Sequence, residues 1–320
     1  MTNKKIIAVS LSLIIAFGVI GAVAWYQFGV PKDENFGTIS IIDDAGRNVT
    51  LTNYPQKIVS LAPSVTEMLS GLELLDKTVG VVSYSGYATD IQNTIEAKNI
   101  TVVGTLNKVS VESVIGLQPD LIIASGAYQQ SLAAKFEEQG KTVMILNPTK
   151  FSEILADISL LGKVTGQDAT ATILVNNMQN RAQEITSKTT NLSTPSVYVE
   201  YFVNKNGYSC YAGSSHVNDL IEMAGGVNIF QNVTDQFVTT STEEVLKANP
   251  EIIVISKGVM SSLSGITPDS IRARPSWNST IAVQNNRIYE VDEALITIWG
   301  PRIVDGLETL AELIHPEVFP

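Results

Sequence analysis

One segment of this chain occurs twice. Residues 110–124, SVESVIGLQPDLIIA, align without a gap to residues 241–255, STEEVLKANPEIIVI. In each copy a serine can cap a short helix, a glutamate (Glu112 or Glu243) follows in the first turn, and a proline ends the helix before an apolar strand. A chain of 320 residues is also longer than one hydrophobic core usually supports. The repeat therefore predicts two similar lobes that share a helix and strand unit.

Strand and helix patterns alternate on both sides of the first copy. A hairpin is predicted from Thr38–Ile42 and Arg47–Leu51, and Ser64 and Glu67 have the spacing of a capping box that opens a helix to Leu75. Alternating units of this kind favour parallel sheets, so we expect an α/β fold with two Rossmann-like lobes whose sheets are parallel. The other elements predicted for the first lobe are Lys57–Leu61, Val79–Val82, Val102–Val103, Ser110–Leu117, Leu121–Ala124, Gln129–Gln139 and Val143–Leu146.

A long helical stretch separates the two lobes. Apolar residues recur at helical spacing over residues 152–188, and Gly166–Asp168 divides this stretch. Its later part would be about 30 Å long, enough to bridge two lobes. We therefore predict an N-terminal lobe (36–151), a linking segment (152–190) and a C-terminal lobe (191–320), joined by a single long helix with a ligand cleft between the lobes. The elements predicted for the second lobe are Ser196–Phe202, His216–Ala224, Glu243–Ala248, Ile252–Ile255, Arg287–Val291 and Pro301–Ile314.

The N-terminus indicates export. Lys4 and Lys5 precede an uncharged, mostly apolar run from Ile6 to Trp25 that is long enough to cross a bilayer. Ala22–Ala24 resembles a signal peptidase site, so residues 1–30 form either a cleaved signal peptide or a retained membrane anchor. Both interpretations place the rest of the chain outside the cytoplasm, at a cell surface or in a periplasm.

Charge and composition exclude several kinds of protein. A net charge of -11 would repel nucleic acid. No catalytic or nucleotide-binding motif is present, so no enzymatic activity, catalytic residue or cofactor is expected. Two histidines far apart in sequence, His216 and His315, make a site for bare zinc or manganese a weak alternative. The single cysteine, Cys210, allows no intrachain disulfide and is interpreted as a small buried hydrophobe.

Several further motifs carry a family resemblance that extends from about Lys57 to Phe319. The motifs are Lys57–Glu67, Gly80–Tyr87, the two copies of the repeat, Ala224–Phe230, Gly300–Arg302 and His315–Glu317. In these motifs the chain resembles the substrate-binding proteins of cobalamin and ferric-siderophore ABC importers. The resemblance implies two lobes joined by one long helix, a metal-chelate ligand between the lobes, and a dimeric permease as partner.

The repeated glutamates acquire a role from this resemblance, which implies that Glu112 and Glu243 dock onto arginines of the permease, one lobe on each permease subunit. Carboxylates at helix N-termini are favoured by the helix dipole and remain free to pair outward. The alternative is that each glutamate only complements the dipole of its own helix.

Aromatic residues are the main ligand candidates. The positions that correspond to the aromatic cleft residues of cobalamin-binding members are Tyr84, Leu106 and Phe237, and the leucine departs from that pattern. Arg302 pairs either with an anionic group of the ligand or with a structural carboxylate, and Ser214–His216 could place a helix N-terminus in the cleft, although ordinary capping is the alternative. The expected ligand is a corrinoid, and a ferric siderophore or a haem is the alternative ligand. An extracellular α/β enzyme is the last alternative for the function of the chain. Further aromatic candidates are Tyr87, Tyr128, Tyr201, Tyr211 and Trp299.

Overall fold

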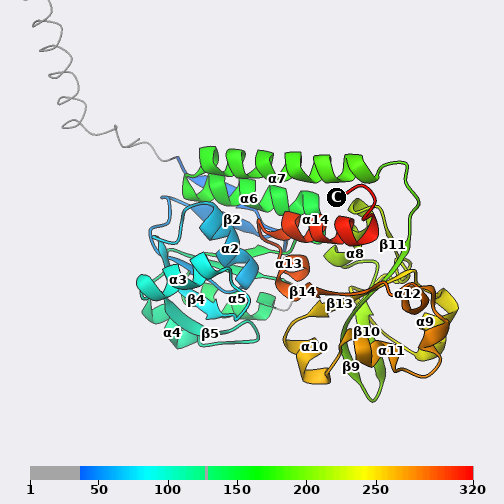
Figure 1. Ribbon diagram of the computed structural model, residues 1–320. Coiled ribbons are helices and arrows are strands. Elements are labelled where there is room, and N and C mark those ends of the chain that lie inside the picture. The colour runs from blue at the N-terminus through cyan, green and yellow to red at the C-terminus, as the bar shows by residue number, and fades with distance from the viewer. Residues whose placement is uncertain (1–36, 127–128, 320) are drawn as a thin grey trace, which may run out of the picture.

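Two six-stranded sheets dominate the structure, one from each half of the chain (Figure 1). The computed structural model describes residues 37–126 and 129–319. A separate hairpin precedes the first sheet, with β1 (Ile39–Ile42) and β2 (Asn48–Leu51) paired antiparallel as the sequence predicts. The α/β class and the division into two lobes are confirmed.

The first sheet has the order β6-β5-β4-β3-β7-β8. Its strands pair in parallel except β6, which joins β5 antiparallel at the edge. All residues of the central strands β3 and β7 are buried, as is usual where helices cover both faces of a parallel sheet. The strands are β3 (Ile58–Ser60), β4 (Thr78–Ser83), β5 (Thr101–Thr105), β6 (Lys108–Val109), β7 (Leu121–Ser125) and β8 (Val143–Leu146), and the helices are α2 (Pro63–Gly71), α3 (Thr89–Ala97), α4 (Val111–Gly116) and α5 (Gln130–Glu137).

The second sheet is mixed, so the prediction of wholly parallel sheets is wrong here. Its order is β12-β10-β9-β13-β14, with β11 paired to β9, and both β10 and β12 run antiparallel to their neighbours. Only Lys205 and Asn206 separate β9 from β10, and so short a connection can join only antiparallel strands. The strands are β9 (Ser196–Asn204), β10 (Gly207–Tyr211), β11 (Val227–Asn228), β12 (Phe237–Thr240), β13 (Ile252–Lys257) and β14 (Ile288–Asp292).

Short helices surround the second sheet and the repeat appears in both lobes. In each copy the predicted serine caps the helix: Ser110 accepts the Ser113 amide at α4, and Ser241 accepts the Glu244 amide at α9. The strands that follow, β7 and β13, are interior strands of their sheets, with a neighbouring strand on each side. The helices are α8 (His216–Met223), α9 (Thr242–Ala248), α10 (Val259–Ser264), α11 (Pro268–Arg272), α12 (Ile281–Gln284) and α13 (Glu293–Thr297).

A layer of three long helices spans the two sheets. α6 (Phe151–Thr165) and α7 (Asp168–Thr189) lie side by side along one edge of the molecule, and α14 (Ile303–Ile314) packs against α7 (Figure 1). Gly166 ends α6 in the left-handed conformation, φ 74°, as the sequence predicts. The 22 residues of α7 extend about 33 Å; within this length Leu174 packs against Gly71 of α2, and Thr189, at the end of the helix, lies beside Gly225 after α8.

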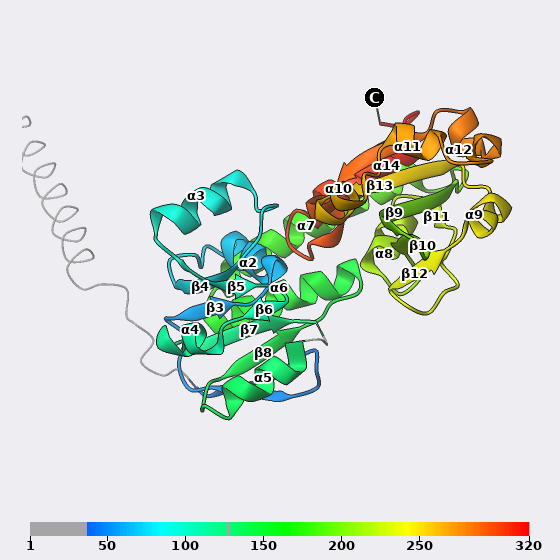
Figure 2. The ribbon, with the colours of Figure 1, turned by 90° about the horizontal axis from the view of Figure 1, so that it is seen from below.

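The largest hydrophobic core runs under this helical layer and joins the two lobes. It contains Leu69 from α2, Leu161 from α6, Leu307 from α14 and Val197 from β9. Two smaller cores lie on the other faces of the sheets, one around Phe136 in the first lobe and one around Tyr198, Trp277 and the fully buried Cys210 in the second. Figure 2 shows the two lobes separated on the side away from these helices.

The start of α2 differs from its prediction. Ala62 is the N-cap and Pro63 follows it, without any side-chain capping bond. Ser64 and Glu67 therefore do not form a capping box. The Glu67 carboxylate is buried and pairs instead with Arg302, which is 235 residues away in sequence. Local spacing could not reveal a partner so distant.

Within residues 37–126 and 129–319, no helix is both long enough and apolar enough to cross a membrane. The predicted signal peptide or anchor, residues 1–30, lies outside the described residues, and so does Tyr128.

Asp157 in α6 is a buried carboxylic acid. Asp157 is only 3% exposed, and its Oδ2 has no hydrogen-bond partner among the described residues. Burial, reinforced by Asp44 and Glu153, raises the pKa of Asp157 to about 8. The folded protein therefore holds this group as a neutral acid over most of the physiological pH range.

Replacing Asp157 should change how stability depends on pH. Because the folded pKa of Asp157 is raised, its contribution is complete below the unfolded pKa, about 3.9, and is lost as the pH rises through 8. We expect Asp157→Asn to raise the free energy of unfolding by on the order of 2 to 5 kcal/mol at pH 8, with little difference from the wild type near pH 4. Denaturant titrations at several pH values test this. The exposed Asp168→Asn is the control, and a pH-independent effect of Asp157→Asn would contradict the assignment.

Candidate ligand-binding site

A cavity of about 720 Å³ lies between the two sheets and is here called the central cavity. In the first lobe its wall is formed where parallel strands end: Ala62 follows β3, Ser125 ends β7 and Asn147 follows β8. The carboxyl ends of parallel strands meet at one edge of a sheet, which is the usual place for a ligand in such folds. The second lobe contributes residues from β9, β10, β12, α8, α10 and α13.

Three aromatic rings from neighbouring strands form the wall of the second lobe. The ring centroids of Tyr201 and Tyr211 are 5.0 Å apart, and each lies 5.6 Å from that of Phe237. Tyr211 and Phe237 are directly paired across β10 and β12. Phe237 is 50% exposed, so its face is available to a ligand. Burial raises the pKa of both tyrosines, which therefore remain protonated hydrogen-bond donors.

His216 and Trp299 form a further part of the central cavity. The Trp299 Nε1 donates to His216 Nδ1 at 2.6 Å, and the two rings meet edge to face at 5.2 Å. Burial lowers the pKa of His216 to about 3, so the imidazole is neutral and can accept this bond. The Ser215 side chain accepts a hydrogen bond from the Asn218 amide in the first turn of α8, which is the ordinary capping alternative. His216 thus fixes the position of Trp299.

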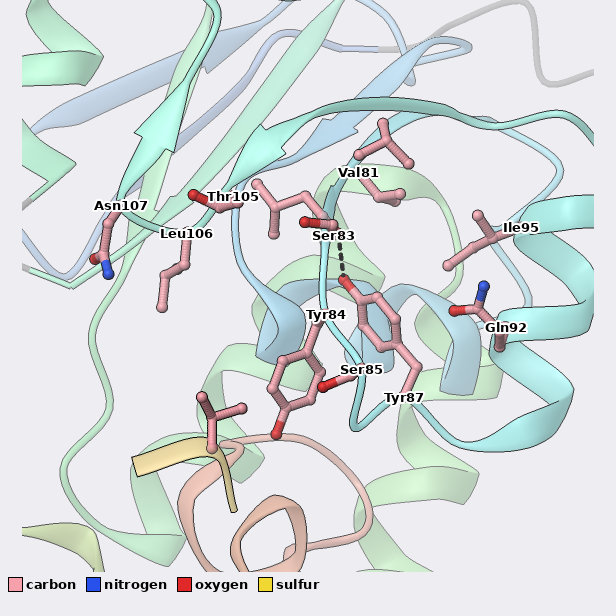
Figure 3. Close-up of a pocket in the computed structure, with 13 residues that line it drawn as sticks. Val81, Ser83, Tyr84, Ser85, Tyr87, Gln92, Ile95, Thr105, Leu106 and Asn107 are labelled. Atoms are coloured by element: carbon pink, nitrogen blue, oxygen red, sulfur yellow. Dashed lines mark hydrogen bonds between the residues drawn. The ribbon is translucent and has the colours of Figure 1, made fainter. Parts of the chain in front are cut away.

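Two more cavities adjoin the central one. The side cavity, about 790 Å³, lies on the first lobe around Tyr84 and shares Leu106 and Asn107 with the central cavity (Figure 3). The acidic cavity, about 560 Å³, lies between Tyr84 and α10 and shares Glu293 with the central cavity. Leu106 and Tyr84, predicted as ligand residues, therefore stand at the junctions of these spaces.

Tyr84 and Tyr87 are predicted alike but differ in the structure. Tyr87 is only 9% exposed, and its hydroxyl donates to the Val82 carbonyl at 3.0 Å and lies 3.2 Å from Thr66 Oγ1, which holds it as a rigid wall (Figure 3). The Tyr84 ring packs edge-on against Tyr87 at 5.4 Å, and its hydroxyl has no hydrogen-bond partner in the described part of the chain. A Cβ at Gly86 would lie 2.6 Å from that hydroxyl, so glycine is what allows the ring to take this position.

Arg302 does not line any of the three cavities. Its guanidinium pairs with Glu67 and donates to the Gly86 carbonyl at 2.9 Å. The Glu67 side chain is 1% exposed; burial raises the pKa of this carboxyl, and the bond from Arg302 opposes that rise. This geometry favours the structural alternative for Arg302, because the ion pair ties the start of α14 to α2 and to the loop that carries Tyr84.

The three cavities contain few charged groups. Among the described lining residues, Asp292 and Glu293 are the only charged ones, and none is a lysine or arginine. Burial raises the pKa of Glu293, whose carboxylate accepts the Val259 amide at the start of α10. The uncharged polar lining of the central cavity includes the side-chain amides of Asn107, Asn147 and Gln236 and the hydroxyls of Ser64, Ser125 and Thr297. The described residues contain no group of three or more His, Cys, Asp or Glu side chains that could hold a metal ion.

Glu112 and Glu243 lie far from these cavities. Both are exposed in the first turns of α4 and α9, which lie at opposite ends of the molecule in Figures 1 and 2. Ser110 Oγ is 3.4 Å from Glu112 Oε2, whereas Glu243 has no side-chain partner among the described residues. At α9 it is Glu244 that closes the capping box with Ser241, so Glu243 is not needed for capping.

Sequence reasoning missed part of the site. It considered His216 at a helix N-terminus and for a bare metal ion but not as a partner of Trp299, and it did not include Gln236, Met260 or Glu293. It also gave Tyr201 and Tyr211 a secondary place, although they form one wall with Phe237. The dipeptide Asn206-Gly207 is a hairpin signal that would have put those two tyrosines on neighbouring strands.

Comparison with known proteins gives consistent matches over most of the chain. A model of the family described as periplasmic binding protein matches residues 58–295. An uncharacterized ABC transporter substrate-binding lipoprotein, YvrC of Bacillus subtilis, is 32% identical over 298 residues, which cover 90% of this chain and 88% of that protein. A cobalamin-binding protein of Halobacterium salinarum is 25% identical over 277 residues, 85% of this chain and 73% of that one. The crystal structure of a periplasmic binding protein from Veillonella parvula superposes with a TM-score of 0.75 at 21% identity, covering 87% of this chain and 98% of that one.

Proposed function

The chain belongs to the periplasmic binding protein family, as a substrate-binding protein of an ABC transporter, and we propose that its ligand is a corrinoid. Proteins of this family bind a small molecule and present it to a permease, and they are not enzymes. In this proposal residues 36–151 and 191–320 are the two lobes on either side of the ligand cleft. The segment 152–190, which contains α6 and α7, links them. Residues 1–30 would direct the chain out of the cytoplasm or hold it on the membrane.

The observation that carries the proposal is the charge of the cavities. A corrinoid is a large, flat macrocycle with amide side chains and little net negative charge. The lining offers amides from Asn107, Asn147 and Gln236 as hydrogen-bonding partners, and the only charged groups among its described residues are the two carboxylates Asp292 and Glu293. Haem carries two propionates, and many ferric siderophores are anionic, so these ligands would meet carboxylates without a compensating cation.

The shape and chemistry of the walls also support a flat ligand. Tyr201, Tyr211 and Phe237 present rings from one lobe, and Leu106 presents an apolar surface from the other. Aromatic rings give a planar ligand a large contact area at low cost in side-chain entropy. The Halobacterium relative is named for cobalamin binding, which agrees with this choice. A ferric siderophore and a haem remain outcomes of the test.

Docking of the loaded protein is proposed to use Glu112 and Glu243. Their exposure, their equivalent positions in the two copies of the repeat, and their location at opposite ends of the molecule suit a contact with both subunits of a permease. Exposed ion pairs contribute about 0.2 to 1 kcal/mol each, so such contacts would orient the complex and still allow release. Reversible docking is what repeated transport cycles need.

Calorimetric titration tests the ligand assignment. We expect the full-length chain to bind cobalamin or cobinamide with a dissociation constant of about 1 μM or lower, and to bind haem and anionic ferric siderophores at least roughly tenfold more weakly. Phe237→Ala should weaken corrinoid binding about 5- to 10-fold through the lost ring contact, whereas Phe319→Ala, outside the cavities, should not. Tight binding of an iron chelate without corrinoid binding would contradict the proposed ligand and leave the family assignment intact.

A further inference from the structure

The side cavity has no role in the function proposed so far. Its walls come from β4, α3 and β5 of the first lobe, and it lies beyond the turn that carries Leu106 and Asn107 (Figure 3). Because the central cavity is lined by the same two residues, the spaces meet at this turn. A ligand seated between the lobes could therefore extend an arm into the side cavity.

The lining of the side cavity is that of a small-molecule site. Val81, Val82, Ile95, Val102 and the rigid ring of Tyr87 form apolar walls. Its volume of about 790 Å³ falls in the range of about 300 to 1,000 Å³ that is common for such sites.

Polar groups and exposed apolar side chains lie at its rim. The side chains of Ser83, Ser85, Thr105 and Asn107 have no hydrogen-bond partner among the described residues, so they are free to bond a ligand. Val102 is 53% exposed at this rim. Apolar walls with a few unpaired polar groups are typical of a site that binds a flat heterocycle through its faces and its edge atoms.

The second lobe reaches this cavity through one residue. Val259, at the start of α10, is 57% exposed and is the only described lining residue that comes from the second half of the chain. A group held in the side cavity would thus contact both lobes. It would add to the contacts that hold the lobes around the ligand.

We infer that the side cavity is a second subsite, which takes a planar, mostly apolar heterocycle that the ligand carries on an arm. The inference rests on the proposed corrinoid ligand, because many corrinoids carry such a base on a flexible loop whereas cobinamide lacks it. The central cavity binds the macrocycle, and the side cavity selects among macrocycles by their appended base. The chain thereby distinguishes complete corrinoids from their base-free precursors.

The test compares two corrinoids on the full-length chain. Burial of an aromatic base predicts that cobalamin binds on the order of 10- to 100-fold more tightly than cobinamide. Val102→Trp fills the side cavity with a side chain that begins on an exposed strand position. This variant should bind both corrinoids alike, with the affinity for cobinamide within about twofold of the wild type.

Two further variants separate occupancy from general damage. Ile42→Trp places the same ring on another exposed strand position, 72% exposed and outside the three cavities, and should keep the wild-type preference. Val102→Ala should keep the fold and lower the preference by about 2- to 5-fold through lost contacts. Equal affinity of the wild type for both corrinoids, or a preference that survives Val102→Trp, overturns the subsite. Binding of neither corrinoid overturns the proposed ligand itself, and the inference with it.

Discussion

Removing the Glu200 carboxylate should destabilise the second lobe by about 3 to 5 kcal/mol. Glu200 on β9 is fully buried, and its two oxygens accept from Arg274 at 2.6 and 2.8 Å and from the Tyr198 hydroxyl at 2.7 Å. The Arg274 side chain is only 11% exposed. Its guanidinium lies 4.2 Å from the ring centroid of Tyr208 and 4.5 Å from that of Trp277. Glu200→Ala leaves this cation buried between two rings without its counter-ion.

The double variant Glu200→Leu/Arg274→Met is the matched comparison. Replacing both members of a buried ion pair by apolar residues is often close to neutral, because neither charge then remains uncompensated. We expect the double variant to recover most of the stability that Glu200→Ala loses, measured by denaturant titration. A loss below about 1 kcal/mol for Glu200→Ala would show that water or another group compensates Arg274.

Reversing both repeated glutamates should abolish coupling to the transporter. If Glu112 and Glu243 dock onto permease arginines as proposed, Glu112→Arg/Glu243→Arg turns both contacts into repulsion, and like charges that face each other across an interface cost several kcal/mol. We expect stimulation of the transporter ATPase by the loaded protein to fall at least about 10-fold. Ligand affinity should be unchanged, because neither residue lines a cavity.

A matched control separates position from net charge. Glu138→Arg/Glu312→Arg reverses two exposed glutamates outside the repeat and changes the net charge of -11 by the same amount. This control should retain most of the stimulation. Single reversals should each give a partial loss. If the control is as defective as the test variant, long-range charge explains the result and the docking assignment fails.

Much of the fold was predictable because the repeat and the periodicities are local features. The serine caps at Ser110 and Ser241, the break at Gly166 and the buried strands each depend on a few adjacent residues. α3 was missed because it is mostly polar, with only Ile91 and Ile95 buried. The antiparallel strand β10 was missed because the Asn206-Gly207 turn was not used.

The candidate site was predictable only in part. Tyr84, Leu106, Phe237 and Tyr87 all line the cavities, but Tyr87 does so only as a fixed wall, and Arg302 lines none of the three cavities. Tyr87 is locked by Thr66 and Val82, and Arg302 by Glu67. Whether an aromatic or charged side chain is free for a ligand depends on such distant partners, and no local pattern contains them.

The two lobes, their shared helix and strand unit, the long linking helices and the exposed glutamates of the repeat can be inferred from the sequence, because these follow from short-range periodicity and capping. The folded chain is needed to learn which rings share a wall, that His216 orients Trp299, that the described lining of the three cavities contains no lysine or arginine, and that a side cavity adjoins the central one. These features arise where residues far apart in the chain meet. Their chemistry depends on burial and on contacts that form only when both lobes pack against the same helical layer.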